Sequence, residues 1–217
     1  PVRKAAADCA RRALPHVSPA SLAIAAPFLL ARLASWTRWG PAPPAVLLAA
    51  LGRPDAAACL AEHLIASKAI PGRVLGAALR LGLVDTHLAA IARGAIRPEL
   101  RATALRTIID GEVCWLDHYE KVWADKRFGI TRRKPVLARR PIARPMSAEE
   151  AIILGAGDRN PRVRYVAAER LVRMASELAE PQRLAALFAG DGSRSVRWLM
   201  DFLARQRTGR TADLKRP

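Results

Sequence analysis

One short pattern occurs twice, 33 residues apart, near the carboxyl end of the chain. It reads DRNPRVRYVAAERL over residues 158–171 and DGSRSVRWLMDFL over residues 191–203. In each copy a turn with an aspartate precedes Val-Arg and an apolar pattern of helical spacing. The matched pairs are Asp158 with Asp191, Val163 with Val196 and Arg164 with Arg197. A fixed period of this length indicates helix pairs stacked into an array, because one pair has too little apolar surface to fold alone.

Helical spacing of apolar residues continues through nearly the whole chain, and runs that alternate at period two are absent. We therefore predict an all-α protein, an α-solenoid of antiparallel helix pairs. Prolines stand where helices are expected to begin, since a first-turn proline sacrifices no hydrogen bond. Ser147 and Glu150 form a capping-box pattern that predicts another helix start. The prolines at expected starts are Pro19, Pro44, Pro54, Pro71, Pro98, Pro161 and Pro181.

The turn aspartate, the Val-Arg pair and the following alanines and leucines resemble the HEAT repeat pattern. PVRKAAADCARRAL at residues 1–14 matches the helical part, and RPELRATALRTI at residues 97–108 is a weaker match. Residues 18–82 match in helical rhythm only, and residues 113–146 do not match. The resemblance implies a curved solenoid of helix pairs that serves as a binding scaffold. In such a ladder we expect Asp158 and Asp191 to cap the following helices, and Arg164 and Arg197 to reach carboxylates or carbonyls of an adjacent turn.

The pattern divides the chain into four parts. Residues 1–112 are predicted to form amino-terminal repeats, of which the first is truncated, and residues 147–208 the carboxyl-terminal repeats. Residues 113–146 are an insertion, and residues 209–217 a flexible tail. Because the chain begins with Pro1, directly on a helix pattern, we expect a monomeric fragment of a longer protein.

The insertion begins with an aromatic pattern in which Trp115, Tyr119 and Trp123 recur every four residues. On a helix this spacing places the three rings on one face. A stripe of this kind packs on the array, or, if exposed, stacks on bases or on a partner peptide.

A basic segment without acidic residues follows the aromatic pattern. Prolines at 135, 141 and 145 disfavour a helix and favour an extended arm or loop. Clustered arginines in such a segment bind phosphates or carboxylates well, because guanidinium is a planar multidentate donor. A solvated basic loop is the alternative. The eight basic residues are Lys126, Arg127, Arg132, Arg133, Lys134, Arg139, Arg140 and Arg144.

The net charge of +17 and the isoelectric point near 11.3 favour anionic partners. Most of the basic residues are arginine, and the number of arginines depends on genome composition as well as on function. Their placement is therefore more informative than their number. No run of apolar residues is long enough for a membrane helix, and no leader pattern is present, so we expect a cytoplasmic protein with no membrane contact. The three cysteines at positions 9, 59 and 114 form no CxxC pair and are expected to be free thiols.

Motifs for catalysis, cofactors and metals are lacking. Cys114 and His118 lie one helical turn apart, but two candidate ligands do not make a zinc site. We therefore predict no enzyme, no cofactor and no metal, and a non-catalytic scaffold for a protein with an acidic surface. The first alternative is a nucleic-acid-binding module that uses the basic segment. The second is an alkylpurine DNA glycosylase-like enzyme, in which Trp123 with Asp125, or Trp198 with Asp201, would imitate the tryptophan and carboxylate of that class.

Overall fold

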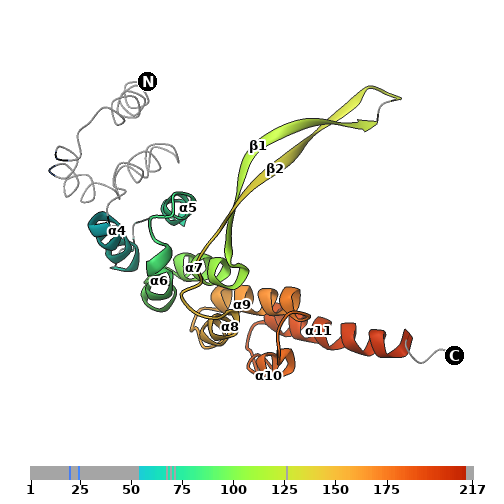
Figure 1. Ribbon diagram of the computed structural model, residues 1–217. Coiled ribbons are helices and arrows are strands. Elements are labelled where there is room, and N and C mark those ends of the chain that lie inside the picture. The colour runs from blue at the N-terminus through green and yellow to red at the C-terminus, as the bar shows by residue number, and fades with distance from the viewer. Residues whose placement is uncertain are drawn as a thin grey trace.

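The computed structural model describes residues 20, 24, 54–66, 68, 70, 72–125 and 127–213, without the side chains of 54–56, 59 and 207–213 (Figure 1). The truncated first repeat and the helix predicted at Pro44 lie outside the described residues, and of the helix predicted at Pro19 only Ala20 and Ile24 are described, both as helical. The described elements are α4 (Pro54–Ala66), α5 (Gly72–Arg80), the 3₁₀ turn η3 (Asp85–His87), α6 (Leu88–Gly94), α7 (Pro98–Asp110), β1 (Glu112–Asp125), β2 (Ile130–Pro141), α8 (Ala148–Ala156), α9 (Pro161–Met174), α10 (Pro181–Ala186) and α11 (Arg194–Asp213).

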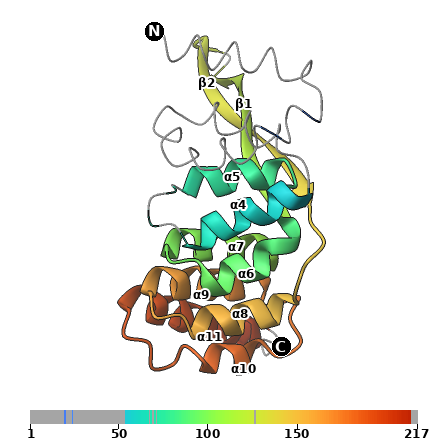
Figure 2. The same cartoon turned by 90° about the vertical axis from the view of Figure 1, so that its left-hand side faces the viewer.

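The helices form a stacked array (Figure 2). Helices α5, α7, α9 and α11 contact one another in turn along one side of it. Helix α6 packs on α7, and helix α8 packs on both α7 and α9. Helix α11 extends to Asp213 and so includes residues predicted as a tail. In the described part of the chain, no helix has both the length and the apolar character needed to cross a bilayer.

Helix starts follow the predicted signals. Pro98, Pro161 and Pro181 each stand in the first turn of a helix. Both halves of the predicted capping box are present at the start of α8, where Ser147 and Glu150 exchange hydrogen bonds. The helix-start predictions at these four positions are therefore confirmed.

In each repeat, the position after the shared apolar residue (Val163 or Val196) carries an arginine, and these arginines bind the turns between helices. Arg164 donates to both carboxylate oxygens of Asp191, and also to the carbonyl oxygen of Asp158 in its own turn. Arg101, on α7, makes the equivalent bonds to the Asp158 carboxylate, at 2.6 and 2.9 Å, and to the carbonyl oxygen of Ala95. Arg197 donates to the carbonyl oxygen of Asp191 at 2.6 Å. The predicted role is thus confirmed for Arg164, whereas Arg197 binds a carbonyl of its own turn, and Arg101 extends the ladder to α7.

The aspartates, however, do not cap helices as predicted. Asp158 accepts from the amide of Asn160, and Asp191 accepts from the amide of Ser193, so each closes its turn. The residue that caps α9 is Asn160, whose side chain accepts from the amide of Arg162. The carboxylates of Asp158 and Asp191 are committed instead to the arginine of the preceding repeat.

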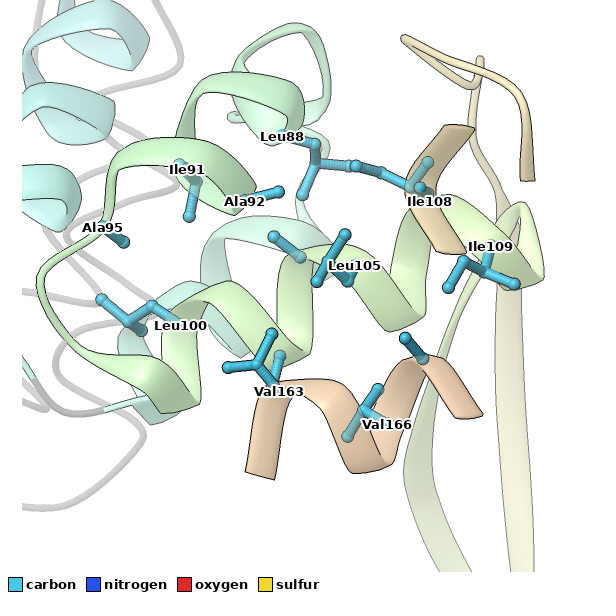
Figure 3. Packing of buried hydrophobic residues seen from close by; sticks show 14 of the residues in the cluster. Leu88, Ile91, Ala92, Ala95, Leu100, Leu105, Ile108, Ile109, Val163 and Val166 are labelled. Atoms are coloured by element: carbon cyan, nitrogen blue, oxygen red, sulfur yellow. The ribbon is translucent and has the colours of Figure 1, made fainter. Parts of the chain in front are cut away.

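A continuous apolar core runs through the array (Figure 3). Val163 is fully buried where α9 meets α7, and its repeat equivalent Val196 is fully buried as well. Leu100 holds the same place at the start of α7. The apolar residue beside each ladder arginine therefore belongs to the core, as the repeat pattern indicates.

The predicted all-α class is wrong. Strands β1 and β2 form a two-stranded antiparallel sheet between α7 and α8, in place of the expected insertion helix. The molecule is thus a helical array with a β-hairpin rather than a pure α-solenoid. The prediction of an extended arm in the basic segment agrees with β2.

Replacing Val163 with Asp should lower the free energy of unfolding by about 3–5 kcal/mol, because it places an unpaired charge in the core. Urea denaturation monitored by circular dichroism measures this change. Arg162→Ser, one residue earlier and exposed, should change stability by no more than about 0.5 kcal/mol. Equal stability of the two variants would contradict the described packing of α9.

The ladder should be sensitive to acid. The side-chain hydrogen bond from Arg164 and the amide of Ser193 lower the pKa of Asp191 below its usual 3.8, although burial opposes them. Because the folded pKa is lower than the unfolded one, this stabilisation is present above the unfolded pKa and is lost as pH falls through the folded value. Asp191→Asn should therefore cost about 1–3 kcal/mol at pH 6, and the difference from the parent should shrink towards pH 3. A difference that is constant across this range in urea titrations would argue against the charge pair.

Candidate functional site

The hairpin projects away from the helices (Figure 1). Strand β1 has 14 residues, which at the usual rise of a strand extend roughly 45 Å. Strand β1 contacts α5 and α7, and most side chains beyond Trp115 are exposed. An isolated hairpin is at best marginally stable in water, so its base must be anchored to the array.

Backbone and side-chain contacts hold the hairpin base on α7. Gly111 ends α7 in the left-handed conformation, with φ of 70°, and turns the chain into β1. Its carbonyl oxygen accepts from the amide of Ile142, just beyond β2, at 3.0 Å. Arg144 lies against Gly111 and donates to the carbonyl oxygens of Ile108 and Ile109, both at 3.1 Å. Val113 then enters the core.

An ion pair ties β2 to the helices on the other side of the base. Arg140 donates to both carboxylate oxygens of Asp85, at 2.7 and 2.9 Å, and to the carbonyl oxygen of Leu79 near the end of α5. The hydrogen bond to Asp85 raises the pKa of Arg140, against the effect of burial. Arg140 is therefore an anchor of the hairpin.

The strand register decides which side chains share a face. Strand β2 pairs without interruption from Ile130 to Pro141, so its side chains alternate strictly between two faces. Strand β1 has an extra residue at Asp117 and another at Ala124, and each extra residue reverses its alternation. Because directly paired residues share a face, we name the two sides by β2 numbering. They are the odd face and the even face.

The odd face is basic, apolar and aromatic. Tyr119 and Trp123 are 56% and 57% exposed on it, and Lys121 lies between them directly opposite Arg133. Its acidic residue is Glu112 at the base, which pairs with Arg139 at 3.0 Å. From base to tip, the pairs of the odd face are Glu112 with Pro141, Cys114 with Arg139, Leu116 with Leu137, Tyr119 with Pro135, Lys121 with Arg133, and Trp123 with Thr131.

The even face has a mixed charge. Lys134 lies directly opposite Glu120, and Arg132 lies opposite Val122. The Nδ1 atom of His118 lies 2.9 Å from Oδ2 of Asp117, and its Nε2 atom lies 3.7 Å from Oε1 of Glu120. The described pairs of the even face are Val113 with Arg140, Trp115 with Ala138, His118 with Val136, Glu120 with Lys134, Val122 with Arg132, and Asp125 with Ile130.

The predicted aromatic stripe is therefore divided. The three rings lie on a strand and not on a helix, and the bulge at Asp117 places Trp115 on the even face, away from Tyr119 and Trp123. Trp115 is half-buried at the base, with the guanidinium of Arg80 5.7 Å from its ring centre. Of the three rings, one packs on the array and two are exposed.

Seven of the eight predicted basic residues are described, and they separate into three groups. Arg140 and Arg144 anchor the base, and Arg139 is paired with Glu112. Lys126 lies outside the described residues. No described carboxylate forms an ion pair with the exposed side chains of Arg127, Arg132, Arg133 or Lys134.

Sequence reasoning missed Lys121 and the hairpin tip. At the tip, Asp125 accepts from the amides of Arg127 and Phe128, at 2.8 and 3.4 Å, and Gly129 has a φ of 66°. This turn presents Phe128, which is 70% exposed, with Ile130 beside it at 53%. Gly129, which adopts a positive φ at little cost, is the residue that could have indicated a turn here.

The geometry disfavours the weaker sequence alternatives. Cys114 and His118 lie on opposite faces of the hairpin, and within the described ranges no three potential metal ligands gather. Trp123 and Asp125 also lie on opposite faces, and Asp125 is used by the tip turn. Trp198 stacks on the apolar ring of Phe202, with ring centres 5.7 Å apart.

The chain was compared with protein-family models, with curated proteins and with solved structures, and none of them matches it. The resemblance to HEAT repeats stays a prediction. The hairpin's own residues are therefore the basis for inferring a function.

Arg140 and Arg133 should respond differently to truncation. Arg140→Ala should lower the free energy of unfolding by about 1–3 kcal/mol, because it leaves the carboxylate of Asp85 without its partner. Arg133→Ala removes the same charge from the exposed part of the hairpin and should cost at most about 0.5 kcal/mol. Thermal melts of both variants measure the contrast, and equal melting temperatures would show that the base is not anchored as described.

Proposed function

We propose that the hairpin binds nucleic acid through its odd face. The observation that carries this proposal is the pair formed by Lys121 and Arg133, directly opposite each other in mid-hairpin. Like charges in directly opposed positions destabilise a sheet. A polyanion that lies across both cations would convert this cost into binding free energy.

The residues around this pair favour nucleic acid over an acidic protein. Tyr119 and Trp123 flank Lys121 on the same face, and both rings are more than half exposed. Cations alone attract carboxylates and phosphates alike, but cations that alternate with exposed aromatic rings match a ligand with both phosphates and ring systems. The acidic protein partner stays a prediction from composition, and no described contact favours it.

The even face is a weaker candidate for the same ligand. Its exposed cations, Arg132 and Lys134, share that face with Glu120 and Asp125. A phosphate approaching from this side meets carboxylates as well as cations. Beyond the pair of Arg139 with Glu112, the two faces of the described hairpin therefore carry similar numbers of exposed cationic side chains, but only the even face has carboxylates next to them.

This difference provides a matched test. Lys121→Ser with Arg133→Ser removes two charges from the odd face, and Arg132→Ser with Lys134→Ser removes two from the even face. Fluorescence anisotropy with a labelled 20-base-pair duplex and a 20-nucleotide single strand measures affinity as a function of salt. We expect the odd-face variant to bind more weakly, and its plot of log affinity against log salt to flatten by about 0.9 per lost phosphate contact on duplex DNA, or about 0.7 on a single strand. The even-face variant should change both quantities less.

Circular dichroism melts establish that both double variants fold like the parent. Equal losses in the two variants would mean that only net charge matters and would contradict an odd-face site. If the parent protein binds neither oligonucleotide but binds polyglutamate, the result would instead support an acidic protein partner.

A further inference from the structure

We infer that the hairpin tip inserts Phe128 between base pairs of double-stranded DNA. This inference rests on the proposed nucleic-acid binding and names its substrate as a duplex with a weakened base step. The tip carries Phe128 and Ile130, which are the most distal described apolar side chains of the hairpin and are both more than half exposed.

Hydrogen bonds to Asp125 define the backbone on which the tip presents its aromatic ring. Asp125 accepts two amide hydrogen bonds across the turn, from Arg127 and Phe128, and Gly129 supplies the left-handed residue that the turn requires. The guanidinium of Arg127 lies over the Phe128 ring, 5.7 Å from its centre. Single exposed apolar residues are common on protein surfaces, but here two of them, Phe128 and Ile130, stand together at the tip of a basic hairpin, which favours a ligand that buries both.

Apolar side chains flanked by cations are the usual wedges with which proteins open a base step. A wedge of phenylalanine or leucine unstacks the step and kinks the duplex, while neighbouring cations hold the phosphates on both sides. Arg127 is adjacent to Phe128 in sequence, and Arg133 of the odd-face site lies three residues beyond Ile130 on β2, so the tip has both components.

A duplex fits the hairpin better than a single strand does. Tyr119 and Trp123 are four residues apart on β1, with Lys121 between them, which separates the rings by roughly 13 Å. They therefore do not form a continuous platform for successive bases. A two-stranded ribbon does fit a groove of B-DNA, and from the minor groove, where wedges of this kind enter, its tip can reach the base pairs.

The test uses the full 217-residue chain and 20-base-pair duplexes with 2-aminopurine beside a central TA step, either perfectly paired or with a one-nucleotide bulge. Unstacking raises 2-aminopurine fluorescence. The parent should raise it and should bind the bulged duplex more tightly, on the order of tenfold, because the bulge has already lost part of the stacking that a wedge must disrupt. Phe128→Leu should keep both effects, since leucine also serves as a wedge.

Phe128→Ala should lose the fluorescence rise and the preference for the bulge, but should keep the parent's salt dependence, because its phosphate contacts are intact. A fluorescence rise as large as the parent's in Phe128→Ala would overturn the wedge and leave the odd-face site standing. A parent that prefers a single-stranded 20-mer would overturn the wedge as well. A parent that binds no oligonucleotide would overturn both proposals.

Discussion

The bond from one repeat's arginine to the next repeat's turn aspartate sets the geometry of the described helices. Arg101 and Arg164 each join the carbonyl groups of their own turn to the carboxylate that follows, so consecutive turns are held at a fixed distance. Asp158 and Asp191 also close their turns through backbone amides. The apolar core supplies most of the stabilisation between neighbouring helices, as hydrophobic burial generally does, but it is not directional. The ladder adds the direction at the starts of α7, α9 and α11, whereas Gly111 and Arg144 set the end of α7, where the hairpin leaves the array.

The hairpin depends on that array, because two strands do not fold alone in water. Its base is buried through Val113 and tied to helix ends by Arg140 and Arg144. These two arginines bind Asp85 and backbone carbonyl groups, so they are not available to a ligand. Farther along the hairpin, Arg139 pairs with Glu112, and the exposed cations beyond it form no ion pair with a described carboxylate. One stretch of sequence thus contains two sets of basic residues, which differ in position relative to the array and not in residue type.

Much of the helical array could be predicted from the sequence, whereas the hairpin could not. Prolines, the capping box and the 33-residue repeat are local signals, and they mark helix starts and core positions such as Val163. The aromatic pattern was ambiguous, because a spacing of four residues suits one face of a helix and also one face of a strand. A ribbon exposed on both faces has no alternating burial, so the usual period-two signal is missing. Pro135 fits β2 because a strand with only one neighbour tolerates proline. The bulge at Asp117, which separates Trp115 from the other rings, has no sequence signal that we recognise.

The length of the hairpin explains why the net charge of the chain is a poor guide to its site. Charges in physiological salt are screened within about 8–10 Å, and the odd face extends well beyond that distance from the helices. The ladder aspartates cannot offset the field at Lys121 and Arg133, nor can the arginines of the array strengthen it. What a ligand meets there is set by the hairpin's own side chains, and the register places Lys121 opposite Arg133 on the odd face and Lys134 opposite Glu120 on the even face. Without the bulge at Asp117, the register of the base would continue and place Glu120 opposite Arg133 and Lys121 opposite Arg132, so this bulge decides which residues share a face with Arg133.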